Sequence, residues 1–394
     1  MLERWVVREH GVTLAGPDPR TMIDPVTPDD LRWAAIGEIT ARLRNWDEGS
    51  WPIIDLHHLG SQSFEVETAC RALYTFETGE MVTKADATAW ALKSLPGEWH
   101  ELIRWSRAGR KQLTRDPARV PEVLQFLRWA VITGVLPRGA PPDVAFLLAA
   151  LFGGVRDALA DNFVGLYLGG SLALGGFDPA TSDVDIVIVT ERPVSDAEFA
   201  ALAMLHTRIP PRGNAFGRIY EVSYVDRAAL QRFADGERRH PTVGADWPFT
   251  RAGHPENFII ERWIVREHGI TVYGPEPETL IDPITPDELR AAVVALFRTW
   301  RAEWSENPPE LFATRHYQAF AVETVCRAHF TFRTGGISTK TEAAQWALRE
   351  LPEPWRSLVA WSRGNRTDET ADPARLPDIG KFIRWAAAEA GLRE

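Results

Sequence analysis

Two aspartates separated by one residue, Asp183 and Asp185, enter an apolar run that ends at Val189. Alternate side chains of an extended strand share a face, so both carboxylates point the same way. Hard divalent cations prefer oxygen ligands, and a carboxylate pair combined with triphosphate oxygens commonly holds Mg²⁺ for phosphoryl or nucleotidyl transfer. The spacing therefore predicts a magnesium site at the start of this strand.

A glycine-rich turn precedes the aspartates, because Gly169, Gly170 and Ser171 follow the branched and aromatic run Phe163–Leu168. Glycine lets the backbone approach a phosphate closely, and a helix that starts after the turn offers amide donors and a favourable dipole to an anion. The hydroxyl of Ser171 adds another donor. This segment is predicted to bind the phosphates of a nucleotide.

A third carboxylate is offered by Glu221, which lies among alternating apolar residues in the segment 218–225. Within reach of an acceptor hydroxyl and of the metal site, this carboxylate would serve as the general base that removes the proton during attack on the α-phosphorus. The alternation alone also permits a surface glutamate on a strand face.

An internal repeat surrounds these residues. Residues 2–32 align without gaps to residues 260–290, and 21 of the 31 positions are identical. After a two-residue deletion the match resumes and pairs Arg71 with Arg327 and Lys84 with Lys340. One module of about 135 residues is therefore present twice.

Apolar residues within each copy recur at three- and four-residue spacing between Pro and Gly borders, which predicts helical bundles. The middle of the chain alternates helical and strand patterns. We predict an α+β nucleotidyltransferase domain with a mixed sheet, flanked by two homologous all-α helical-bundle domains. The expected boundaries are an extra helical copy at 1–135, a proline-rich linker at 136–141, the nucleotidyltransferase domain at 142–258, and the second helical copy at 259–394.

Composition excludes several classes of protein. The formal charge of −10 argues against a general nucleic-acid binder, because neutralising phosphates requires a basic surface. The most apolar stretch, 144–155, is too short to span a bilayer, and the first residues lack the pattern of a secretory signal, so we expect a cytoplasmic protein without a membrane segment. The two cysteines, Cys70 and Cys326, fall at equivalent positions of separate copies and are expected to be buried thiols.

The arrangement of Gly-Ser, an interval of eleven residues and Asp-x-Asp at the start of an apolar strand resembles the DNA polymerase β nucleotidyltransferase superfamily. Three further features resemble the streptomycin/spectinomycin adenylyltransferase family: Glu221 on its strand, the Arg-Glu-His-Gly and Asp-Pro-x-Thr-Pro stretches, and the Cys-Arg-Ala…Thr-Gly-Gly…Thr-Lys segment. The similarity runs from about Pro142 to the C-terminus. It implies a catalytic domain followed by a helical domain, with ATP and the acceptor bound between them.

The resemblance assigns roles to individual residues. Ser171 and Ser182 would hold the triphosphate, and Mg²⁺, with two ions expected, would bind to Asp183 and Asp185. Glu221 would be the base. The second helical copy would supply Arg327 and Lys340 to the phosphates of ATP, although a structural salt bridge for the arginine and an ordinary surface position for the lysine remain alternatives.

The acceptor implied by the resemblance is a small hydroxylated, aminoglycoside-like antibiotic, modified with AMP from ATP and with release of pyrophosphate. The sequence departs from streptomycin-binding members, because their cleft aspartate corresponds here to Tyr317 and their tryptophan region aligns with 240–247 only through gaps. Two alternatives stay open: an adenylyltransferase that modifies a protein hydroxyl, and a non-catalytic nucleotide-binding interaction protein. The intact set of three carboxylates favours an enzyme.

Overall fold

The structure, a computed structural model, describes residues 2–47, 56–110, 112–136, 140–232, 239–245, 247–253, 258–306 and 310–392. It divides into two compact units. The first comprises Met1–Arg138 and Pro142–Gly153, and the second comprises Gly139–Pro141 and Gly154–Glu394. Residues 137–139 of the predicted linker lie outside the described residues.

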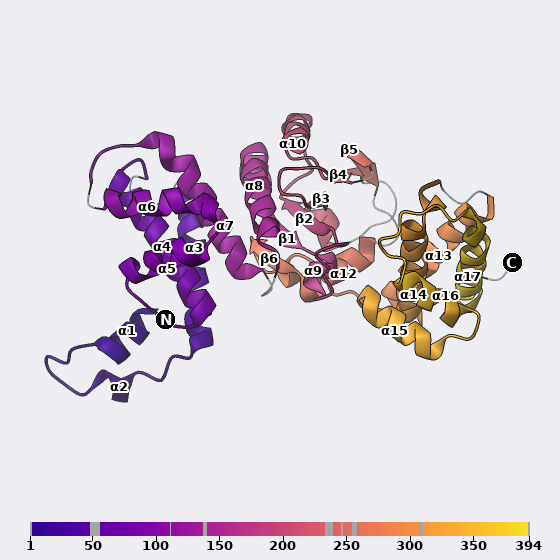
Figure 1. Ribbon diagram of the computed structural model, residues 1–394, viewed down its shortest axis with the longest axis horizontal. Helices are drawn as coiled ribbons and strands as arrows, with labels where there is room; N and C mark the ends of the chain where they lie inside the picture. Colours follow the sequence, from indigo (N-terminus) through magenta and orange to yellow (C-terminus); the bar gives the residue numbers. More distant parts are fainter. Residues whose placement is uncertain are drawn as a thin grey trace. The chain divides into compact units, whose positions relative to one another are not determined.

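The first unit contains a helical bundle, as the three- and four-residue spacing predicts (Figure 1). Its helices are α1 (Leu2–His10), α2 (Pro19–Met22), α3 (Pro28–Asp47), α4 (Leu59–Thr78), α5 (Lys84–Ser94), α6 (His100–Gly109), α7 (Val120–Val135) and the first part of α8 (Pro142–Leu159). The rings of Trp99, Phe126 and Trp129 pack together in the core, with centroids 5.1–5.8 Å apart. Burial of these large rings supplies much of the apolar contact that holds the short helices together.

The second unit begins with a mixed sheet of strand order β5-β4-β3-β2-β1-β6. The strands are β1 (Phe163–Leu168), β2 (Val184–Thr190), β3 (Tyr220–Asp226), β4 (Arg239–Gly244), β5 (Trp247–Gly253) and β6 (Ile270–Tyr273). Strands β2 and β3 run parallel and are joined through α10 (Asp196–Arg208), whereas the other neighbouring pairs are antiparallel. A mixed sheet of this kind confirms the predicted fold class of the middle region.

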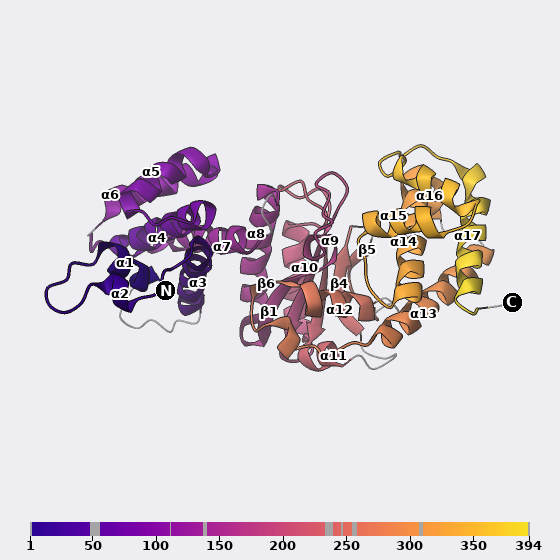
Figure 2. The same ribbon diagram turned by 90° about the horizontal axis from the view of Figure 1, so that it is seen from below.

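Helices cover both faces of the sheet in this unit (Figure 2). On one face, His206 of α10 lies beside the buried tyrosines of β3, with its ring nitrogens 2.8 Å from the hydroxyls of Tyr220 and Tyr224. On the other face, α12 (Phe258–His268) packs Phe258 and Val265 into a buried cluster with side chains of β1, β2 and β3. Because alternate residues of β3 face opposite sides, Glu221 lies on the face that α12 covers.

A second helical bundle follows the sheet, with α13 (Pro286–Glu306), α14 (Arg315–Thr334), α15 (Lys340–Glu350), α16 (Trp355–Arg363) and α17 (Leu376–Glu389). It repeats the packing of the first bundle, because Trp355, Phe382 and Trp385 form the same aromatic group, with Phe382 and Trp385 5.8 Å apart. Cys70 and Cys326 are both buried free thiols at equivalent places in α4 and α14. The predicted duplication of a helical module is therefore visible in the packing as well as in the sequence.

One element departs from the all-helical expectation for 259–394. Ile270–Tyr273 forms β6, which pairs antiparallel with β1 and completes the sheet of the preceding domain. The module therefore contributes its first helix and a strand to the nucleotidyltransferase domain before its bundle begins. No helix among the described residues is long and apolar enough to cross a membrane.

Candidate active site

Three carboxylates predicted from the sequence meet at one end of the parallel strand pair. Asp183 precedes β2, Asp185 lies in β2, and Glu221 in β3 is the direct register partner of Asp185. One oxygen from each carboxylate lies within 4.8 Å of the other two, and all three side chains are partly buried. This is a set of hard oxygen donors whose spacing could hold a divalent cation.

The glycine-rich turn approaches this group very closely. Gly170, the first residue of α9 (Gly170–Ala173), has φ +52°, and a Cβ atom placed on it would lie 1.6 Å from Oδ2 of Asp185. Only glycine fits this position, both for its left-handed backbone and for the space. The next residue, Ser171, holds its hydroxyl buried and without a hydrogen-bond partner among the described residues. A buried hydroxyl without a partner in the turn that touches Asp185 is a donor left available for a ligand.

Ser182 is placed differently from Ser171. Its hydroxyl oxygen accepts a hydrogen bond of 3.0 Å from the amide of Asp178, and its own amide donates to the carbonyl of Asp178 at 2.8 Å. The residue therefore closes the loop between α9 and β2. It fixes the backbone just before Asp183, and its hydroxyl hydrogen remains available as a donor.

The second helical copy brings its two predicted cations to the carboxylates. Arg327 of α14 and Lys340 of α15 both act to lower the pKa of Asp185. Lys340 follows Thr339, the N-cap of α15. The Thr339 side chain packs against the loop after α9, where a Cβ added to Gly176 would lie 2.9 Å from the threonine methyl group. Burial lowers the pKa of Arg327, while Asp185 and Glu323 oppose that change.

A fourth carboxylate, Glu261 in the first turn of α12, was not identified from the sequence. Burial raises its pKa to about 7, and its charge adds to the repulsion at Asp185. Burial first, then Asp183 and Glu261, raise the pKa of Asp185 to about 8 against the attraction of the two cations. The sequence offers one signal for this glutamate, because the repeat has glutamate at the equivalent position of both copies, Glu3 and Glu261. An excess of negative charge at a buried point is what a bound cation would neutralise.

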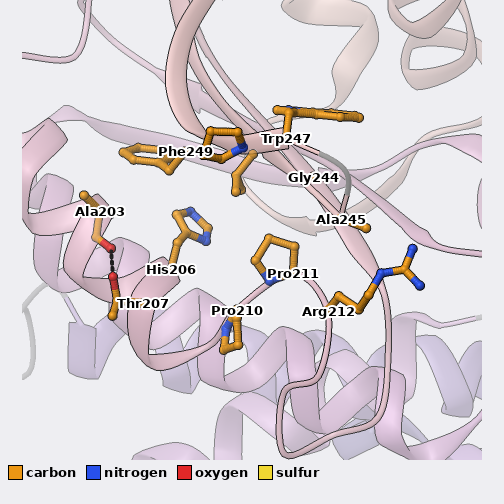
Figure 3. A pocket seen from close by; sticks show the side chains of 12 residues that line it. Ala203, His206, Thr207, Pro210, Pro211, Arg212, Gly244, Ala245, Trp247 and Phe249 are labelled. Atoms are coloured by element: carbon orange, nitrogen blue, oxygen red, sulfur yellow. Dashed lines mark hydrogen bonds between the residues drawn. The ribbon is translucent and has the colours of Figure 1, made fainter. Parts of the chain in front are cut away.

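A separate pocket of about 460 Å³ lies on the α10 side of the sheet (Figure 3). His206, Arg212, Trp247 and Phe249 are among its lining residues. Burial lowers the pKa of His206 to about 4, so this imidazole is neutral at pH 7. Since Glu221 faces the opposite side of β3, the pocket lies across the sheet from the carboxylates and is not the place of phosphate transfer.

Comparison with known families assigns most of the chain. Residues 21–128 and 279–387 each match the family described as "Aminoglycoside adenylyltransferase, C-terminal domain", and residues 154–231 match "Nucleotidyltransferase domain". The first family covers both helical copies, and the second covers the glycine turn and all three carboxylates. The comparison therefore recovers the duplication that the repeat predicts.

Curated relatives and a solved structure extend this assignment. An aminoglycoside (3'') (9) adenylyltransferase of Escherichia coli is 24% identical over 63% of this chain and 95% of its own length. A spectinomycin 9-adenylyltransferase of Campylobacter jejuni is 26% identical over 54% of this chain and 82% of its own length. The crystal structure of spectinomycin adenyltransferase AAD(9) from Enterococcus faecialis with ATP and spectinomycin shares the fold, with a TM-score of 0.50, 16% identity, and coverage of 62% of this chain and 98% of that one.

Proposed function

Because this chain belongs to the aminoglycoside adenylyltransferase family and is a nucleotidyltransferase, we propose that it transfers AMP from ATP to a hydroxyl of an aminoglycoside-like antibiotic. The observation that carries the proposal is the convergence of Asp183, Asp185 and Glu221 within 4.8 Å. The turn that touches Asp185 carries the unsatisfied hydroxyl of Ser171, and two cations from the helical copy lie within electrostatic reach of Asp185.

The donor set fits Mg²⁺, since it consists of carboxylate oxygens that carry more negative charge than the nearby cations balance. Asp183 and Asp185 would hold the metal, which when bound supplies Lewis-acid polarisation of the phosphates and charge neutralisation. Ser171 and Ser182 would donate hydrogen bonds to the triphosphate. Arg327 and Lys340 would pair with its oxygens and fix its orientation.

Glu221 would act as general base. Its carboxylate takes the proton of the acceptor hydroxyl while that oxygen forms a bond to the α-phosphorus. The bond between the α-phosphorus and its bridging oxygen to the β-phosphorus breaks at the same time, and pyrophosphate leaves. Because Asp185 and Glu221 are direct register partners on paired strands, base and metal ligands are held on one rigid element.

The test is incubation with labelled ATP, Mg²⁺ and a panel that includes streptomycin, spectinomycin and other aminoglycosides. Addition of one AMP to an acceptor, with pyrophosphate released in equal amount, is the expected result. Asp185→Asn should abolish the signal, and Asp161→Asn serves as control, because that carboxylate is exposed and far from the site in the fold. Label that appears on protein instead of on any small acceptor would replace the acceptor proposed here with a protein hydroxyl.

A further inference from the structure

The first helical copy carries a segment whose equivalent is buried in the second copy. Residues 2–23 form α1, α2 and an extended stretch between them, and several of their apolar side chains lie in solvent. Val12 is 84% exposed and Leu14 is 95% exposed. In the second copy Val272, the equivalent of Leu14, is 3% exposed because it lies in β6 against β1.

The same contrast holds along the helix of the segment. Val7 is 46% exposed, whereas its equivalent Val265 is 1% exposed in the cluster beneath the sheet. Met22 is exposed, and its equivalent Leu280 is buried in that same cluster. Since 21 of 31 residues are identical between the copies, the exposed segment retains an apolar surface already shaped for a nucleotidyltransferase domain.

Polar residues of the segment repeat the pattern. Arg262 is 4% exposed and donates hydrogen bonds of 2.7 Å to the carbonyls of Leu230 and Gln231 in α11 (Arg227–Gln231) of the nucleotidyltransferase domain. Its equivalent, Arg4, is exposed and makes no hydrogen bond or ion pair with any described residue. The first copy therefore keeps the guanidinium donor, but within the described part of the chain Arg4 has no counterpart of the two carbonyls that Arg262 binds in the second copy.

A third feature is the cation pair of α4 and α5. Lys84 has its pKa lowered to about 8, first by burial and then by the nearby charge of Arg71. Arg71 has no hydrogen bond or ion pair with the residues that the structure describes. The equivalent pair in the second copy, Arg327 and Lys340, acts on the carboxylate of Asp185. In the first copy the carboxylates that act on Lys84 are Glu67 and Glu65 of its own module, so the pair lacks only the further counter-charge that a nucleotidyltransferase domain provides.

We propose that residues 2–23, together with Arg71 and Lys84, form a docking surface for a nucleotidyltransferase domain on a second polypeptide whose own docking position is vacant. An intact copy of this chain is a poor partner, because its residues 260–281 would first have to leave and expose an equivalent apolar surface. A nucleotidyltransferase domain without a helical domain loses nothing in this way. Docking would bury the exposed valines and leucine, satisfy Arg4 and give the cation pair its carboxylates.

The experiment uses full-length chains. The first chain is wild type, and the second presents a vacant position through Arg262→Ala and Val272→Asp. The second chain also carries Val7→Asp and Leu14→Asp, so that its own N-terminal segment cannot dock. Sedimentation of the mixture should show a one-to-one complex, and hydrogen exchange should show new protection at residues 11–15 of the first chain. Both readouts concern binding, so they stand apart from the outcome of the transfer assay.

Matched variants of the first chain decide whether the complex uses the proposed surface. Arg4→Ala with Leu14→Asp should weaken binding at least tenfold, whereas Leu113→Asp, at a residue of the same module that is 86% exposed, should leave it unchanged. If Val272→Asp prevents folding, Val272→Ala takes its place beside Arg262→Ala, because it weakens the buried contact of β6 without placing a charge there. Absence of a complex with a folded second chain would overturn the proposal. Equal binding by all first-chain variants, or self-association of wild type through residues 2–23, would overturn it as well.

Discussion

Replacement of Gly170 by alanine tests whether the glycine turn and the carboxylates form one site. The added Cβ would lie 1.6 Å from Oδ2 of Asp185, where unstrained non-bonded atoms lie about 3.5 Å apart, so the turn or the carboxylate must move by about 2 Å. Displacement of a catalytic group by about 1 Å can cost about a hundredfold in rate. Gly170→Ala should therefore lower kcat at least a hundredfold, about 2.7 kcal/mol of barrier.

The matched control is Gly175→Ala. Gly175 also has a positive φ, +71°, but a Cβ on it would meet nothing within 4 Å. Both variants bear the cost of a left-handed alanine, about 1–2 kcal/mol, and only Gly170→Ala displaces the carboxylate. Urea unfolding should show the backbone cost in both variants, with any further loss in Gly170→Ala arising from the displaced carboxylate, while AMP transfer and stabilisation by Mg²⁺ with ATP should fail only in Gly170→Ala. Equal activity of the two variants, whether both high or both low, would refute the reasoning.

Three other predictions follow from the same geometry. Stabilisation by Mg²⁺, measured as a shift in Tm, should grow from pH 6.5 to pH 8.5, by up to about tenfold in affinity per pH unit, because the metal binds the ionised form of Asp185, whose pKa is raised to about 8. Without metal, the contribution of Asp185 to folding stability should fall as the pH rises from the unfolded pKa, 3.8, to about 8, because the folded state holds the proton over that range. A Mg²⁺ response that does not change with pH would contradict the assignment of Asp185. Glu221→Gln should keep ATP affinity and lose about 10²–10⁴-fold in kcat, so a variant that loses only affinity would place Glu221 in the binding site. Lys340→Ala should reduce turnover at least about tenfold and Lys84→Ala should leave it within about threefold, under 1 kcal/mol, and the reverse order would assign the cleft to the first copy.

Much of the site could be predicted because its residues lie in strongly patterned segments. β1 has the bounds expected from its branched and aromatic run, and β2 and β3 differ from expectation only at their ends. The parallel pairing of β2 and β3 is expected of two apolar strands joined through a helix, whereas the register that sets Asp185 opposite Glu221 is seen only in the structure. The local sequence pattern was sufficient to predict the site residues that lie in or next to an apolar strand.

The hairpin of β4 and β5 could not be predicted in this way. Pro241 lies inside β4, where it lacks an amide to donate, and it is tolerated because the pairing of β4 with β3 starts only at Thr242, so that no β3 residue faces Pro241. The place of Glu261 was also hidden, since nothing within α12 says which of its faces turns toward Asp185. That orientation is set by Val265 and Phe258 packing under the sheet, and by Arg262 bonding to the carbonyls of α11.

The two copies show why such elements escape local rules. Residues 11–15 and 269–273 have closely similar sequences, yet only the second segment forms a strand, β6. The difference lies in β1, which offers the second segment an edge to pair with and a sheet face to cover its apolar side chains. A single edge strand gains little in water without such a partner. In this protein the strand is therefore a property of the module and the sheet together, because the similar segment of the first module, without a sheet edge to pair with, forms no strand.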